Sequence, residues 1–158
     1  VAPSVNQPMW GGMPITETVP TLSNDTYQYA NPPLDIPSSV SQITGFTTFN
    51  QAHNMMIVPG NRVPIAVSNQ NIAFFRLRSN IRIPVKISSA LATSVEGNSV
   101  LQNVTWDFTN HELTTMGTSS TALNVQILKV DPNSKIVHYD SSTGDVSWQY
   151  GNAALIQL

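Results

Sequence analysis

The residues best suited to acid–base or metal chemistry are three histidines, and their spacing supports neither role. His53 precedes an apolar run, His111 lies in a polar stretch, and His138 lies in an alternating segment. No two of them have the separation of a helical or hairpin ligand pair, and the HExxH motif is absent. The chain has no cysteine, which excludes thiolate ligands, thiol nucleophiles and disulfides. We therefore expect no metal site.

A serine hydrolase would need a serine, a histidine and an acid brought together by the fold. The least distant set along the chain is Asp35, His53 and one of Ser38, Ser39 or Ser41. Such a triad is defined by geometry and not by chain order, and the GxSxG nucleophile elbow is absent. Acidic residues are scattered singly, which indicates no glycosidase pair, and no phosphate-binding or dinucleotide motif occurs. We expect a non-enzymatic protein without a cofactor and keep the hydrolase as an alternative.

The most specific cluster in the chain is cationic. Residues 1–61 contain no Lys or Arg, and five of the seven basic residues lie within positions 62–86. Four of these alternate with apolar residues, so an extended chain would place them on one face: Arg76, Arg78, Arg82 and Lys86. This cationic stripe predicts a surface for an anionic glycan, an acidic partner or RNA. The alternative is a solvated sheet face that pairs with acids on adjacent strands.

Three aromatic side chains are candidate anchors for a sugar or a protein partner, namely Trp10, Trp148 and Tyr150. Trp106 alternates with Val104 and is expected in the core instead.

The elements that would position these residues are short strands. Residues 72–87 have the clearest period-two alternation, and they predict either a hairpin turning at Ser79-Asn80 or one long bent strand. Pro84 cannot donate to a strand ladder, so its strand is expected at a sheet edge or at a bulge. An earlier strand is expected within residues 13–19, and Val63, Ile65 and Val67 alternate as in a half-buried strand.

The second half of the chain predicts an antiparallel meander. Strands are expected in residues 100–108, 123–130, 135–139, 146–150 and 153–158, with turns at 131–134 and 141–144. Only residues 88–95 offer a helical window, and it is short. We predict an all-β fold, an antiparallel β-sandwich or barrel of the jelly-roll-like or immunoglobulin-like kind, with little or no helix.

The first 40 residues differ from the rest in their proline content, with prolines at positions 3, 8, 14, 20, 32, 33 and 37. Proline fixes φ, lacks an amide donor and keeps its predecessor extended. We predict that residues 1–40 form an extended arm or linker packing on a β-sandwich or barrel domain of residues 41–158. Membership of these 40 residues in the sheet is left open.

The composition indicates which partners to expect. Only 10% of residues are charged, the net charge is −2, and Asn, Gln, Ser and Thr supply the polar surface. We expect no nucleic-acid partner, because there is neither a positive excess nor a basic terminal arm. No apolar run reaches about 18 residues, so no membrane span is expected. Two glycosylation sequons, at Asn24 and Asn103, matter only in a secretory pathway.

Three features carry a family resemblance: the proline-rich residues 1–37, the passage Val58-Pro59-Gly60 followed by residues 72–78, and the Asn/Ser/Thr-rich meander ending at Leu158. In these features the chain resembles the protruding (spike) domain of capsid proteins of small non-enveloped RNA viruses, in the style of insect viruses. Some insect-virus protruding domains are proposed to carry an Asp-His-Ser set. Here Asn54 follows His53 and no adjacent His-Ser pair exists, so that site is not transferred.

The resemblance implies an outward-facing β-domain on the capsid surface of a virion, tethered to a separate shell domain. Such domains associate as dimers or trimers, contact other capsid subunits and attach to a host receptor or glycan. Two structural alternatives remain open. One is a jelly-roll shell subunit of a multi-protein capsid, and the other is a non-viral or phage carbohydrate-binding or adhesion module.

Overall fold

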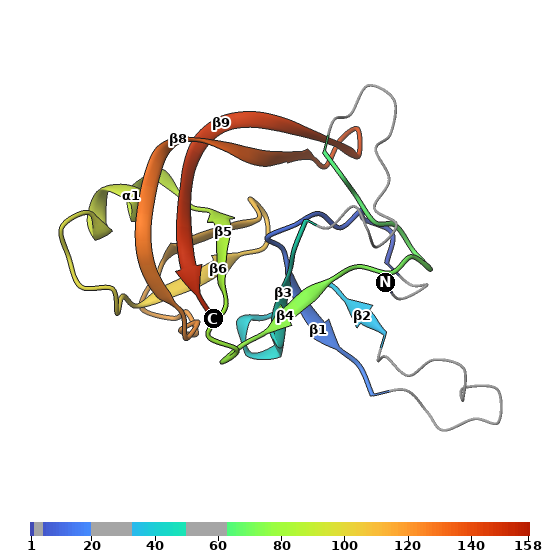
Figure 1. Cartoon of the computed structure of the whole chain (residues 1–158), viewed down its shortest axis with the longest axis horizontal. Coiled ribbons are helices and arrows are strands. Elements are labelled where there is room, and N and C mark those ends of the chain that lie inside the picture. The colour runs from blue at the N-terminus through green and yellow to red at the C-terminus, as the bar shows by residue number, and fades with distance from the viewer. Residues whose placement is uncertain (2–4, 20–32, 50–62) are drawn as a thin grey trace.

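The computed structural model describes residues 1, 5–19, 33–49 and 63–158, and its named strands pair antiparallel throughout (Figure 1). A four-stranded sheet contains β1 (Pro14–Glu17), β2 (Leu34–Asp35), β3 (Gly45–Thr47) and β4 (Phe74–Arg76), in the order β2-β1-β3-β4. A three-stranded sheet contains β5 (Arg82–Lys86), β8 (Gln126–Asp140) and β9 (Asp145–Gln157), in the order β5-β9-β8. A two-stranded ladder joins β6 (Val104–Asp107) to β7 (Glu112–Thr115).

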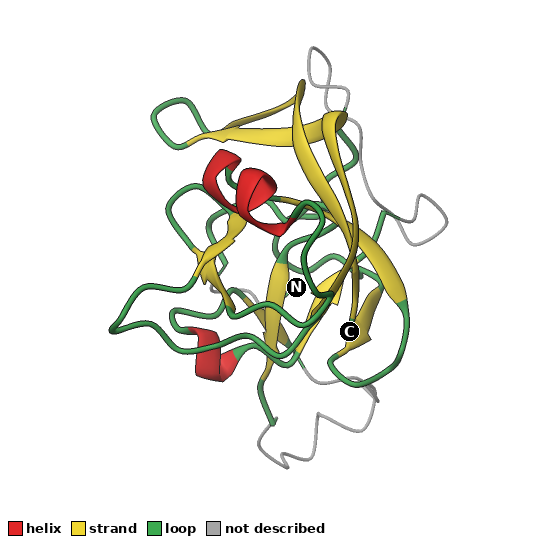
Figure 2. Cartoon of the chain, turned by 90° about the vertical axis from the view of Figure 1, so that its left-hand side faces the viewer, coloured by secondary structure: helices red, strands yellow, loops and turns green. Residues whose placement is uncertain are grey.

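Helix is limited, among the described residues, to α1 (Ser89–Val95) and a single 3-10 turn at Val40–Gln42, which Figure 2 shows beside the strands. The predicted all-β class with little helix is therefore confirmed. Each sheet has an open strand order and none closes into a barrel within the part described, so the arrangement is compatible with a sandwich.

The described part of the proline-rich segment joins the four-stranded sheet. The strand expected within residues 13–19 is present as β1, which pairs with β2 on one side and β3 on the other. Gly45 allows the next pairing, because a Cβ there would overlap the Phe75 carbonyl on β4. The described residues of this segment therefore belong to the sheet and help to build the core. Whether they join the sheet was the question that the sequence had left open.

The alternation predicted in β5 is confirmed by its packing. Ile83 on β5, Ile156 on β9 and Ile127 on β8 are in register and buried, at 4%, 0% and 5% exposure. The neighbouring register row consists of Arg82, Gln157 and Gln126, and it places these polar side chains on the opposite face of the sheet. β5 is also an edge strand, as Pro84 predicted.

The prediction that residues 72–87 form a hairpin or one long bent strand is wrong. They form neither a hairpin nor one bent strand, because β4 pairs with β3 while β5 pairs with β9 in another sheet. Arg78 and Asn80 between them adopt left-handed backbone angles, with φ of 68° and 57°. Two left-handed residues so close together redirect the chain and end the strand alternation.

The expected meander is also wrong in its C-terminal part. Four of its short strands fuse into one long hairpin, β8 and β9, that arches over the molecule (Figure 1). The proline-containing segment expected as a turn is instead absorbed as a register shift between Asp131 and Ser134. The turn expected at residues 141–144 is confirmed.

The short helical window at residues 88–95 is confirmed as α1, with the Ser88 side chain accepting a hydrogen bond from the Leu91 amide at 3.2 Å. Two other local expectations differ from the structure. β7 was not expected, because its sequence has only one apolar residue, Leu113. Val63 and Ile65 are buried, but the described residues of their segment form isolated bridges, such as that between Met9 and Ala66, in place of the expected strand.

Two hydrophobic clusters form the interior, and the β8–β9 hairpin contributes to both. The first core gathers residues of β5, α1, β6, β7 and the paired ends of β8 and β9, including Ile156 and Trp106. The second core gathers the N-terminal segment, residues 63–72 and the turn half of the hairpin, including Val137 and Val146. Trp106, expected in the core, is 4% exposed.

Candidate functional site

The structure divides the cationic stripe between two sheets. Arg76 on β4 forms a bidentate pair with Glu17 on β1, with Nη2 2.6 Å from Oε1 and Nε 2.9 Å from Oε2. The hydrogen bond from Arg76 lowers the pKa of the Glu17 carboxyl. The guanidinium also lies 5.8 Å from the centre of the Phe74 ring. Arg76 is thus satisfied within its own sheet.

Lys86 is also engaged inside the molecule. Its Nζ donates to the Asn110 carbonyl at 2.8 Å and lies 3.2 Å from Oε2 of Glu112 on β7. The side chain is only 20% exposed. Arg76 and Lys86 are therefore paired with acids, but these acids are not on adjacent strands of the same sheet: β3 lies between β4 and β1, and β7 belongs to a different ladder from β5.

The other two cations of the stripe are exposed and have no internal partner. Neither the Arg78 nor the Arg82 side chain forms a hydrogen bond or an ion pair within the described part of the chain. Arg78 also has a left-handed backbone, with φ of 68°, which is uncommon for a long side chain and costs about 1 kcal/mol or more. Arg82 lies on the polar face of β5, opposite Gln157.

That polar face leads into a pocket of about 550 Å³. Gln157 on β9 is the central member of a register row with Arg82 on one side and Gln126 on the other. Six primary amide side chains line the hollow, which we call the amide pocket: Asn80, Gln102, Asn103, Asn124, Gln126 and Gln157. Arg78 lines it as well, and no lining residue is acidic.

Backbone hydrogen bonds fix the walls of the amide pocket. The Asn80 amide donates to the Leu158 carbonyl at 2.9 Å, and the Leu158 amide donates to Ile81 at 3.0 Å. The Leu123 amide donates to Val104 at 2.8 Å. The C-terminal end of β9 is therefore tied to the turn that carries Arg78. A site on such fixed elements is preorganised for a ligand.

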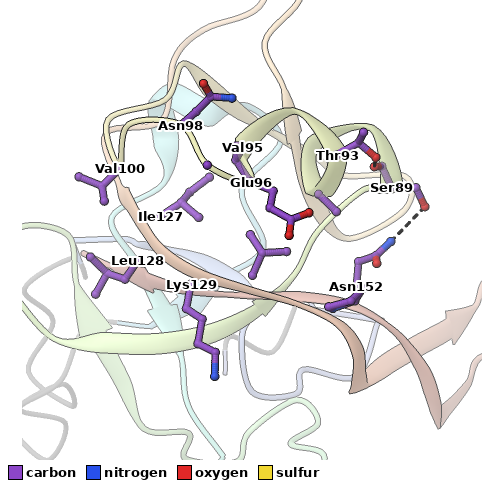
Figure 3. A pocket seen from close by; sticks show the side chains of 14 residues that line it. Ser89, Thr93, Val95, Glu96, Asn98, Val100, Ile127, Leu128, Lys129 and Asn152 are labelled. Carbon is purple, nitrogen blue, oxygen red and sulfur yellow. Dashed lines mark hydrogen bonds between the residues drawn. The ribbon is translucent and has the colours of Figure 1, made fainter.

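A second pocket, of about 520 Å³, lies between α1, the loop after it and β8 (Figure 3). Apolar side chains such as Val95 and Ile127 form its interior, and Asn152 donates to Ser89 Oγ at 3.1 Å on its border. Figure 3 shows the Glu96 carboxylate directed into this pocket and the Lys129 amino group directed away. The amide pocket differs from this one in that its lining includes six primary amides and no Asp or Glu side chain.

The three aromatic candidates lie in different environments. Trp10 is 4% exposed and belongs to the second core, so its ring is not available to stack on a partner. Trp148 is half-buried, with its ring 5.3 Å from that of Phe49. Tyr150 is 70% exposed and remains accessible. None of the three lines the amide pocket.

The described residues of the hydrolase alternative form no Asp-His-Ser arrangement. His53 lies outside the described residues. Asp35 Oδ1 accepts from the Ile36 amide at 2.8 Å, and Ser38 Oγ donates to Gln42 at 2.9 Å. Ser39 and Ser41 have their hydroxyls 3.1 Å from each other.

No group of three or more His, Asp or Glu side chains suited to a metal occurs among the residues that the structure describes. Within the same residues, no helix is long and apolar enough to cross a bilayer. The sequon residue Asn103 is exposed on the amide pocket, whereas Asn24 lies outside the described residues.

Comparison of the chain with protein-family models, with curated proteins and with solved structures found no match. The resemblance to capsid protruding domains therefore remains a hypothesis.

The sequence indicated Arg78 and Arg82 but missed the amides around them. The pocket draws its lining from four segments: the turn after β4, the loop before β6, the segment leading into β8, and the end of β9. The abundance of Asn and Gln was visible in the composition. Their convergence depends on strand register, and no local spacing encodes it.

Proposed function

We propose that this chain is a β-domain that attaches to a host-cell receptor or glycan, displayed on the outer surface of a non-enveloped virus particle. The observation that carries attachment is the pair Arg78 and Arg82, two exposed cations without an internal partner beside a pocket lined by amides. The virion location rests on the resemblance alone.

The polar surface supports a binding role. Uncharged amides and hydroxyls form short-range hydrogen bonds with little long-range field, which favours recognition of neutral or weakly charged ligands. Tyr150, at 70% exposure, adds an accessible aromatic side chain outside the pocket. Rigid strands with variable loops are a common way to present such contacts.

The attachment hypothesis predicts saturable binding to intact cells. The domain, fused to a trimeric fluorescent carrier to raise avidity, would be titrated on a panel of cell lines by flow cytometry. The carrier alone is the control. A glycan array and light scattering after size-exclusion chromatography complete the test. A strict monomer that binds no cell line and no glycan would contradict the proposal.

The same chromatography distinguishes the shell-subunit alternative. A protruding domain should elute as a soluble dimer or trimer, because its contacts are with a few neighbours. A shell subunit should form larger closed particles at high concentration.

A further inference from the structure

Resting on the proposed attachment function, we propose that the amide pocket binds a saccharide bearing a carboxylate, with Arg78 as the counter-ion. The pocket's volume of about 550 Å³ lies within the range of about 300–1,000 Å³ that is usual for small-ligand sites.

The hydrogen-bonding capacity of the pocket matches a polyhydroxylated ligand. A primary amide donates and accepts at once, and so does a sugar hydroxyl. The side chains of Asn103, Asn124 and Gln126 form no hydrogen bond with other described residues. Gln157 Nε2 reaches Asn80 Oδ1 only at 3.4 Å, a weak contact that a ligand can replace. The free amides are therefore available for hydroxyl groups.

The charge of the pocket favours a single anion. The Arg78 side chain is exposed and unpaired, its backbone is left-handed, and no Asp or Glu side chain lines the pocket. A guanidinium binds a carboxylate through two parallel hydrogen bonds. Arg82 is next to Gln157 in the register row and adds positive potential at the border.

The small number of cations argues against a highly sulfated polymer. Binding to a polyanion gains strength with each charge that a Lys or Arg neutralises. Only Arg78 lines the pocket, and the stripe cations Arg76 and Lys86 are already paired with acids. A terminal sugar with one carboxylate, such as sialic acid, fits this charge better.

Apolar groups complete the site and set the expected strength. Leu101 is 69% exposed and borders the pocket, and Leu123 and Val125 lie buried beneath it. These side chains can contact the C–H groups of a sugar ring. No aromatic ring lines the pocket for stacking. We expect a dissociation constant of about 1 mM for one site, which becomes useful through multivalent display.

The test is a titration of the isotopically labelled domain with sialyllactose, followed by NMR. The domain would be made in bacteria so that Asn103 stays unmodified. Chemical-shift changes are expected at the pocket amides and Arg78, and lactose should bind at least about tenfold more weakly. Arg78→Gln should weaken sialyllactose binding by about tenfold or more. Arg78→Lys should give an intermediate loss, because it keeps the charge without the bidentate geometry.

Matched variants keep the outcome interpretable. Lys135→Gln removes one exposed positive charge from β8, away from the pocket, and should leave binding unchanged. Asn124→Ala, at an exposed pocket position, should weaken both ligands. Equal affinity for lactose and sialyllactose, shift changes outside the pocket, or wild-type affinity in Arg78→Gln would each overturn the inference.

Cell binding separates this inference from the proposed function. Both stand if sialidase treatment of the cells and Arg78→Gln each abolish binding. If binding survives both and is removed by protease treatment, attachment holds but the ligand is a protein and the inference is wrong. If the wild-type domain binds no cells, the proposed function fails, whereas the titration still decides the pocket's chemistry.

Discussion

His111 is held where a positive charge is unfavourable. Its ring packs edge-on against Trp10 and Tyr139, with ring centres 5.2 and 5.5 Å away, and Gln7 Nε2 lies 3.2 Å from its Nε2. Burial lowers the pKa of His111, the charge of Lys86 lowers it further, and Asp107 partly opposes the shift. These contacts link the N-terminal segment, the β6–β7 turn and β8 through one titratable ring.

The sign of this shift predicts a loss of stability in mild acid. Because the folded state prefers neutral His111, the unfolded chain binds more protons below its ordinary pKa of 6.5. The stabilisation is therefore complete above pH 6.5 and falls as the pH drops toward the lowered folded pKa. Urea unfolding between pH 7.5 and 5 should show this decline, and His111→Asn, which tolerates the left-handed backbone at φ 51°, should make it shallower. Burial also lowers the pKa of the Val1 ammonium, so this group gives a decline of the same sign that the variant keeps.

His138→Asn is the matched control, because His138 has none of these ring contacts. It should retain the wild-type decline. The carboxyl groups with lowered pKa values, Glu17, Asp107 and Asp140, titrate below the ordinary values of 4.5 and 3.8, so their contribution lies outside this window. An unchanged pH dependence in His111→Asn would refute the assignment.

At the scale of elements, Gly45 determines whether β3 can approach β4. A Cβ at this position would overlap the Phe75 carbonyl, which belongs to the backbone and cannot rotate away. We expect Gly45→Ala to lower the free energy of unfolding by about 2–3 kcal/mol through this forced separation. Gly117→Ala is the control, since its Cβ would meet only Ser120 Oγ at 3.6 Å. Equal stability of the two variants in chemical denaturation would contradict this account.

The elements also show how far the sequence could predict the fold. Two local signals sufficed for β5. Its period-two alternation predicted which face is buried, and Pro84 predicted its position at the sheet edge. The proline-containing segment of β8 suggested a turn, yet long-range pairing with β9 carries the strand through it as a register shift. The switch between β4 and β5 depends on left-handed Arg78 and Asn80, whose residue types do not by themselves require that conformation.

For the candidate site, the sequence predicted the charged residues but not their partners. Arg78 and Arg82 were identifiable as cations, but which of the four stripe residues stay unpaired depends on the distant acids Glu17 and Glu112. Trp10 was expected to be accessible and is buried, because the β8–β9 hairpin brings Tyr139 onto its ring. Contacts between residues so far apart in the chain leave no signature in local spacing.

At the scale of the whole molecule, the β8–β9 hairpin makes two cores into one cooperative unit. Its turn half packs Val137 and Val146 into the second core, while its other half packs Ile127 and Ile156 into the first. The strand pairing is continuous along the hairpin apart from the register shifts. A substitution that disrupts packing in one core should therefore strain the strands that build the other. The amide pocket lies where these strands enter the first core, at the start of β8 and the end of β9.

This arrangement predicts that a cavity in the second core lowers the stability of the entire domain. Val146→Ala, at a position 1% exposed, should cost about 2 kcal/mol and lower the melting temperature by about 4–8 °C. Far-ultraviolet circular dichroism and tryptophan fluorescence should report one coincident transition, because Trp10 and Trp106 occupy different cores. Ile156→Ala, in the first core, should give the same single transition. If instead each variant shifts the unfolding of its own core alone, the hairpin does not couple them, and the walls of the amide pocket would stay ordered while the N-terminal sheet unfolds.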